Sequence, residues 1–315
     1  MPRFGPTLKR TLSLVFLVCV GYFLWRALRR NWASVSAFEL HPSYPFVAAA
    51  FGVTILSVLF STWSWHLSVN SLAEGESRIT FKQSFATVNL SGLTKYVPGK
   101  VWAYALQMYL LTSLRFSKSL VLYVNLLNLA ISLICNVMLG LACWLIASSQ
   151  YRAPVGLALA GLVLFDIACI LFCGPILSAA VTLLNRAFKR NISRCRPSPA
   201  LMLELHALHF GAAMASGLSS FLLCFAVGYH VDVRLGFLVT ASSLIADVAG
   251  YLAFMVPGGL GVREGIMFAM LGGAARGPIA LVLPLAARIV SMLSDISVGA
   301  LAVKLVRGWS RSRPE

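Results

Sequence analysis

Val97-Pro98-Gly99-Lys100 and Val256-Pro257-Gly258-Gly259 begin with the same three residues, and each interrupts an apolar stretch otherwise long enough to enter a lipid bilayer. A segment in contact with lipid must satisfy its own backbone hydrogen bonds, and a Pro-Gly pair prevents this locally. Irregular backbone at membrane depth is tolerated only where protein buries it or where it lines a wet cavity. Broken segments at corresponding places in two halves of a chain therefore indicate a binding site near the middle of the membrane.

The composition agrees with a membrane location. Hydrophobic residues make up 59% of the 315 residues and charged residues only 11%, and the mean hydropathy is +0.83. Soluble domains carry about one quarter charged residues, so this composition argues against a water-soluble domain. We expect an all-α polytopic membrane protein in which residues 1–315 form a single integral membrane domain.

Six apolar stretches have the length of a membrane crossing. They lie at about residues 11–28, 46–68, 119–146, 155–184, 202–229 and 279–303. Between them, the stretches at about 81–112 and 235–272 are interpreted as re-entrant helical hairpins. The predicted breaks are Pro98 and Gly99 in the first hairpin, and Pro257, Gly258, Gly259 and Gly261 in the second.

Three crossings separate the two hairpins, and an odd number of crossings places them on opposite faces of the membrane. This predicts an inverted repeat with half-repeats at about 46–150 and 202–305, in which the two hairpin tips approach each other. The repeat depends on one shared tripeptide and on its placement, so chance duplication of Val-Pro-Gly is the alternative.

The net charge of +16 is interpreted through the loops that carry it. Placing the N-terminus in the cytoplasm puts sixteen of the 26 basic residues on inner loops and six on outer loops, which favours two cytoplasmic termini in a cytoplasmic membrane. Arg26, Arg29 and Arg30 disagree with this orientation. The loop from Arg186 to Arg196 is expected to contact anionic lipid headgroups rather than nucleic acid.

Charged residues at membrane depth are costly and are kept where they are paired, hydrated or needed. Those predicted to bind substrate are Lys100, Arg263, Glu264, Arg288 and Asp295. Arg288 and Asp295 are two helical turns apart, so they face one side of the last crossing and could bracket a polar cavity. The alternative is that each pairs with a hairpin charge, for instance Arg288 with Glu264, and only docks the hairpin.

In the second hairpin, a helix restarting near Val262 would offer free N–H groups to a phosphate, with Arg263 adding a bidentate donor. Glu264 has two further interpretations, because an acidic residue in a first helical turn also answers the helix dipole and could accept a proton or cation. Lys100 stands at the mirror-related break and could hold the same anionic group. Lys95 is expected to reach the headgroups of the cytoplasmic face.

Other patterns add less. His206 and His209 share a helix face, but no third ligand is evident, so neither a metal site nor a cofactor is predicted. The sequence contains no catalytic constellation that would indicate an enzyme. Small residues at Gly211, Ala215 and Ser219 repeat every four positions, which suits close helix packing either within the chain or in a homodimer.

The segment from Val256 to Gly265 resembles the signature of the flippase-like membrane domain shared with lysylphosphatidylglycerol synthases, and Lys95 to Lys100 resembles the earlier motif of that domain. The resemblance covers essentially the whole chain. It implies movement of a membrane lipid, an anionic phospholipid or a phosphate-bearing lipid-linked precursor, between leaflets. The synthases add a soluble aminoacyl-transferring domain, and we expect none of that chemistry here. The alternative function is a membrane accessory subunit, or an enzyme, of envelope-lipid biosynthesis.

Overall fold

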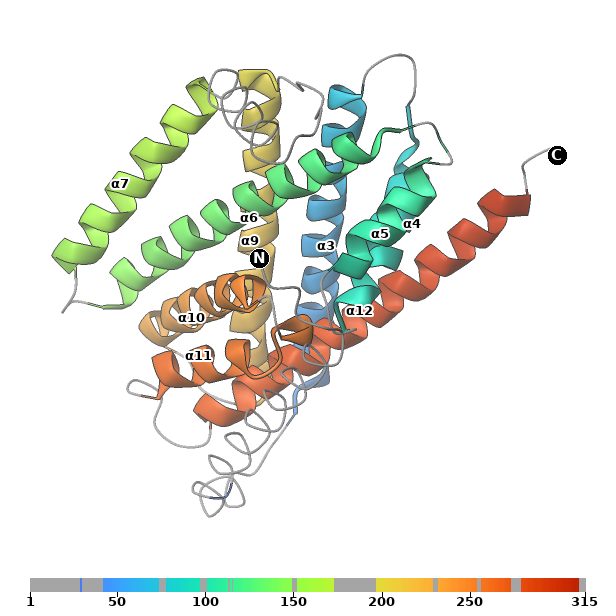
Figure 1. Ribbon diagram of the computed structural model, residues 1–315. Coiled ribbons are helices and arrows are strands. Elements are labelled where there is room, and N and C mark those ends of the chain that lie inside the picture. Colours follow the sequence, from blue (N-terminus) through green and yellow to red (C-terminus); the bar gives the residue numbers. More distant parts are fainter. Residues whose placement is uncertain are drawn as a thin grey trace, which may run out of the picture.

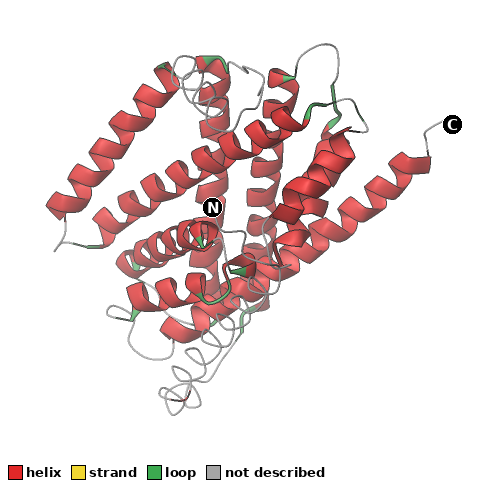
Figure 2. Cartoon of the chain, in the orientation of Figure 1, coloured by secondary structure: helices red, strands yellow, loops and turns green. Residues whose placement is uncertain are grey.

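The computed structural model describes residue 29 and residues 42–73, 78–96, 101–112, 114, 116–148, 152–172, 197–228, 232–253, 256–272 and 279–311. All regular secondary structure in these ranges is helical, and no strand occurs in them (Figures 1 and 2). The all-α fold is therefore confirmed. The predicted crossing at 11–28, the break residues Pro98 and Gly99 with Lys100, and the basic loop from Arg186 to Arg196 lie outside the described residues.

Six described helices are long and apolar enough to cross a membrane. They are α3 (Tyr44–Leu72), α6 (Lys118–Ala147), α7 (Arg152–Leu171), α9 (Pro199–Ala226), α10 (Val233–Leu252) and α12 (Ile279–Arg311). Five of them overlap predicted crossings, although residues 173–184 of the predicted crossing at 155–184 lie outside the described residues. The sixth, α10, was assigned to the second hairpin, but the Pro-Gly break lies beyond its end, so its 20 residues form one uninterrupted apolar helix.

Both interrupted stretches fold back on themselves. In the first, α4 (Phe81–Gly92) and α5 (Val101–Thr112) pack together, with the short helix η1 (Leu93–Tyr96) ending the first arm. In the second, α11 (Val262–Leu271) follows the short helix η2 (Pro257–Gly259) and packs against α10. The elements η1 and η2 touch, so the two broken segments meet at their interruptions.

Three glycines make the second interruption. Gly258, Gly259 and Gly261 have φ values of 58°, 66° and 78°, which residues with a side chain rarely adopt. Gly259 also lies against Gly250 of α10, where a Cβ would come within 2.9 Å of the Gly250 Cα. The glycine-rich sequence therefore permits both the left-handed turn and the contact between its backbone and α10.

Helix α9 is the centre of the bundle, packing against α3, α6 and α10 (Figure 1). On its small-residue face, a Cβ at Gly211 would lie 3.5 Å from the Phe60 ring of α3. The Ser219 hydroxyl donates to the Ala50 carbonyl of α3 at 2.9 Å. This face therefore packs within the chain, and its use in a homodimer stays a prediction.

Amide side chains hold the first hairpin in place. The Gln107 Nε2 of α5 donates to the Ser91 Oγ of α4 at 2.8 Å. The Asn125 Nδ2 of α6 donates to the Gln107 Oε1 at 2.6 Å. A buried amide satisfied at both ends fixes the relative position of three helices, because leaving either end unpaired would be costly in an apolar interior.

Candidate functional site

A polar cavity of about 160 Å³ lies between α3, α9, α10, α11 and α12, beside the tip of the first hairpin. A buried water needs roughly 10–15 Å³ by the same measure, so the cavity holds far more than one water. Six of its lining residues are charged: Lys95, Asp247, Arg263, Glu264, Arg288 and Asp295. Charges gathered inside an apolar helix bundle mark a functional site in the usual case.

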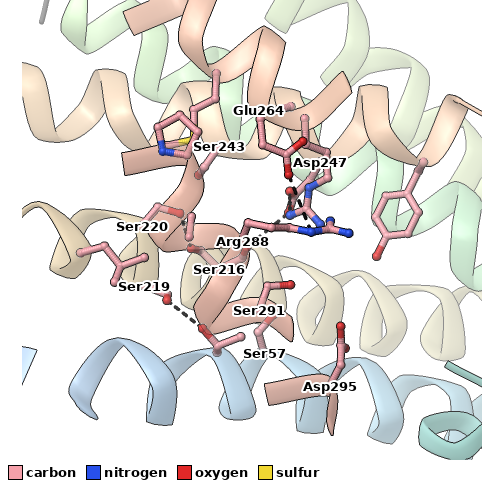
Figure 3. Close-up of a pocket in the computed structure, with 18 of the residues that line it drawn as sticks. Ser57, Ser216, Ser219, Ser220, Ser243, Asp247, Glu264, Arg288, Ser291 and Asp295 are labelled. Carbon is pink, nitrogen blue, oxygen red and sulfur yellow. Dashed lines mark hydrogen bonds and ion pairs between the residues drawn. The ribbon is translucent and has the colours of Figure 1, made fainter. Parts of the chain in front are cut away.

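Arg288 projects from α12 into this cavity and is only 9% exposed (Figure 3). Its Nη1 donates to the Gly258 carbonyl at 2.9 Å, which ties α12 to the second hairpin. Its Nε lies 3.7 Å from the Glu264 Oε1, an ion pair without a hydrogen bond. The buried Nε and Nη2 have no hydrogen-bond acceptor, so part of this guanidinium is left with unused donors.

Arg263 pairs with Asp247 of α10, and the guanidinium lies at the edge where α11 meets α10. The pair is partly buried, with 31% of the Arg263 side chain exposed and 16% of the Asp247 side chain. Gly250 makes room for it, because a Cβ there would lie 2.4 Å from the Arg263 Cγ. The predicted phosphate donor is therefore already engaged by a carboxylate in this conformation.

The first hairpin contributes a second ion pair. The Lys95 Nζ lies 2.6 Å from the Asp295 Oδ2, and the Tyr96 hydroxyl donates to the same oxygen at 2.5 Å. The Arg288 guanidinium stands over the Tyr96 ring, 5.7 Å from its centre. Lys95 was expected to reach lipid headgroups; its ion pair with α12 turns it inward instead.

Glu264 caps the start of α11, as acidic residues in a first helical turn ordinarily do. Its Oε2 accepts a hydrogen bond from the Gly261 backbone N–H at 2.5 Å, at the start of α11. Its other oxygen faces Arg288. The expected helix start near Val262 is confirmed. The Glu264 carboxylate already accepts the hydrogen bond of the Gly261 N–H group. An anion bound at the start of α11 would therefore have to share this helix end with Glu264.

Hydroxyl groups complete the lining. Several helices bring serine and threonine side chains to the cavity, of which Figure 3 labels most: Thr54, Ser57, Ser216, Ser219, Ser220, Ser243 and Ser291. The Ser219 and Thr54 hydroxyls lie 2.7 Å apart. Such side chains can donate or accept, so the wall between the ion pairs suits a polar headgroup of varied chemistry.

Four of the five residues predicted to bind substrate line this one cavity: Arg263, Glu264, Arg288 and Asp295. The fifth, Lys100, lies outside the described residues. Asp247 was not among the residues predicted to bind substrate, and nothing in its local sequence indicates its pairing with Arg263. The hydroxyl lining was also missed, because isolated serines in apolar helices ordinarily pack or bond to their own backbone.

Membrane-length helices enclosing a charged cavity define an integral membrane protein. The sequence matches the family model described as the lysylphosphatidylglycerol synthase TM region over residues 10–299, and the chain belongs to that family. Neither a curated protein nor a solved structure matches the chain.

Proposed function

We propose that this protein is a lipid translocase of the cytoplasmic membrane that moves an anionic phospholipid, or a phosphate-bearing lipid-linked precursor, between leaflets. Membership of the lysylphosphatidylglycerol synthase TM family supports a role with membrane lipids. The cavity beside the two hairpin tips supports a substrate with a polar headgroup, which enters the protein while its acyl chains stay in lipid.

The observation that carries the proposal is that the buried Arg288 guanidinium has hydrogen-bond donors without an acceptor. A guanidinium has five donors in a planar fork, and this buried one leaves Nε and Nη2 unbonded in the cavity. Unused donors on a buried cation are costly unless a ligand satisfies them. A phosphate accepts two parallel hydrogen bonds from such a fork, so an anionic headgroup is the natural complement.

In the neighbouring ion pairs, a substrate phosphate could take the place of the carboxylate partners. Arg263 and Lys95 are held by carboxylates that line the same cavity, and each cation belongs to a different hairpin. An arriving phosphate would compete with Asp247 or Asp295 for these cations and so loosen one hairpin at a time. If the hairpins are re-entrant from opposite faces, as proposed from the repeat, this exchange gives alternating access.

The test is lipid movement in vesicles of phosphatidylethanolamine and phosphatidylglycerol containing fluorescent NBD-phosphatidylglycerol. Dithionite destroys the fluorescence of the outer leaflet only, so the second phase of the decay measures movement between leaflets. Arg288→Gln removes the charge-assisted donors, each worth roughly 1.5–3 kcal/mol, so we expect the rate to fall about ten- to hundredfold. Arg152→Gln, at the exposed start of α7, is the matched control.

Arg288→Lys separates binding from docking, since it keeps the charge and one donor for the Gly258 carbonyl but loses the fork. We expect this variant to remain monodisperse in detergent while its rate stays well below that of the wild type. Wild-type vesicles that move NBD-phosphatidylglycerol no faster than protein-free vesicles would reject an anionic phospholipid as the substrate and favour the lipid-linked precursor or an accessory subunit of envelope-lipid biosynthesis. An unaltered rate in Arg288→Gln would reject the site.

A further inference from the structure

A second group of buried polar side chains lies between α6, α7 and α9. Of these helices, α6 and α7 contribute no residue to the lining of the cavity described above. Asp166 is the one buried residue among the 20 of α7. Its Oδ1 lies 3.0 Å from the Nε2 of His206 on α9. An otherwise peripheral apolar helix thus places a single ionisable group against a single imidazole.

The hydrogen bonds fix the protons of His206. Its Nδ1 lies 2.6 Å from the Met202 carbonyl, and a carbonyl only accepts, so Nδ1 carries a proton. The contact between Nε2 and the carboxylate then needs one further proton, either on the imidazole or on Asp166. The pair therefore holds one shared proton and is neutral with it, as an apolar surrounding requires.

His209, one turn along α9, carries its proton on the other ring nitrogen, Nε2. The Asn128 Oδ1 accepts from the Ser64 hydroxyl, and its Nδ2 donates to the Ser68 hydroxyl and the Val124 carbonyl. The amide oxygen therefore faces the His209 Nε2, 3.0 Å away, so Nε2 is the donor. The Nδ1 of this buried imidazole keeps a lone pair with no partner.

Few other titratable groups surround these side chains in the described residues. Cys135 of α6 and Cys169 of α7 lie within electrostatic reach of Asp166. The other titratable side chains of the packed helices, besides the charged residues named next, are Tyr123 and Cys143 of α6, Cys224 of α9, and Tyr44 and His66 of α3, the His66 Nδ1 bonding to the Ser84 hydroxyl of α4. Charged residues stand at the first positions of α6 and α7, Lys118 and Arg152, and Glu204 of α9 is exposed. Within the part of the chain that the structure describes, no fixed charge thus replaces the shared proton.

We propose that Asp166 and His206 form a proton-binding site within the membrane, through which proton transfer is coupled to lipid movement. The coupling rests on the proposed translocase function; the proton site does not. Loss of the shared proton would leave a nitrogen lone pair facing a carboxylate, and their repulsion would weaken the contact that the one buried residue of α7 makes with α9.

Asp166→Asn is the decisive variant. The amide still donates to His206 Nε2, so α7 stays docked, but the shared proton is gone. Asp232→Asn is the matched control, because this exposed residue caps α10 and asparagine caps a helix equally well. His206→Gln serves as a second variant if Asp166→Asn is not monodisperse in detergent.

Two measurements separate the proton site from the coupling. Infrared difference spectra against pH report protonation of both carboxyl and imidazole groups, and we expect the wild type and Asp232→Asn to share a pH-dependent change in one of these bands that Asp166→Asn lacks. In NBD-phosphatidylglycerol vesicles, an inside-acid pH gradient is expected to change the wild-type rate severalfold and to leave the Asp166→Asn rate unchanged.

Identical spectra for the wild type and Asp166→Asn would overturn the proton site. A response of Asp166→Asn to the gradient equal to that of the wild type would overturn the coupling. If the wild type moves no lipid, the translocase proposal fails, and a pH-dependent carboxyl or imidazole band lost in Asp166→Asn still supports the proton site.

Discussion

Gly259 allows a direct test of how the second hairpin closes. Substitution by alanine adds a Cβ that would lie 2.9 Å from the Gly250 Cα and 3.1 Å from its carbonyl oxygen, at a φ of 66°. A left-handed conformation costs an L-residue about 1–2 kcal/mol. Overpacking against backbone adds about 1–3 kcal/mol, so we expect Gly259→Ala to lower the free energy of unfolding by about 2–5 kcal/mol.

Gly265→Ala is the matched control, six residues further along the chain. Gly265 lies within α11, and a Cβ there would have no neighbour within 4 Å. Alanine is favoured over glycine inside a helix by about 0.5–1 kcal/mol, so this variant should be slightly more stable than the wild type. The two substitutions add the same atoms and are expected to act in opposite directions.

The assay is unfolding in mixed micelles by increasing the fraction of sodium dodecyl sulfate, followed by circular dichroism. Gly259→Ala is expected to unfold at a lower fraction than the wild type, and Gly265→Ala at an equal or higher one. The reasoning is refuted if Gly259→Ala unfolds together with the wild type, or if both variants lose the same stability.

The other predictions concern packing within the bundle and use the same unfolding assay. Gly217→Leu should cost about 1–3 kcal/mol, because even its Cβ would lie 2.6 Å from a methyl group of Thr240, whereas Gly211→Ala meets ordinary contact distances and should be neutral or stabilising. Asn128→Leu should cost about 1–3 kcal/mol for each polar group it leaves unpaired. Asn136→Leu should cost less, because the bonds described for Asn136 stay within its own helix; equal losses would contradict this.

The sequence predicted those features that depend on local pattern. Uninterrupted apolar length predicted five of the six long helices, and the glycine run predicted the turn before Val262. Spacing alone placed Arg288 and Asp295 on one face, and both line the cavity. In each case the cause lies within a few residues of the chain, where helix geometry and backbone conformation decide the outcome.

Pairings between distant residues could not be predicted in this way. Lys95 meets Asp295 across 200 positions, and nothing near either residue distinguishes that contact from one with lipid headgroups. Asp166 and His206 likewise lie on different helices, and their hydrogen bond follows from the packing of α7 against the bundle. Helix α10 was not counted among the crossings for a simpler reason: the Pro-Gly pair marks a break, but does not show how long the unbroken helix before it is.

The charges of the cavity also determine how the protein would respond to a membrane potential. The described lining carries three cations and three carboxylates: Lys95, Arg263, Arg288, Asp247, Glu264 and Asp295. With its pairs intact, this lining is electrically neutral, and a potential does no net work on it when the empty protein changes conformation. An anionic headgroup adds one negative charge, on which 100 mV acts with about 2.3 kcal/mol for a full crossing. Voltage would then act on the loaded step through this charge, whereas the cavity lining adds no net charge to the return step.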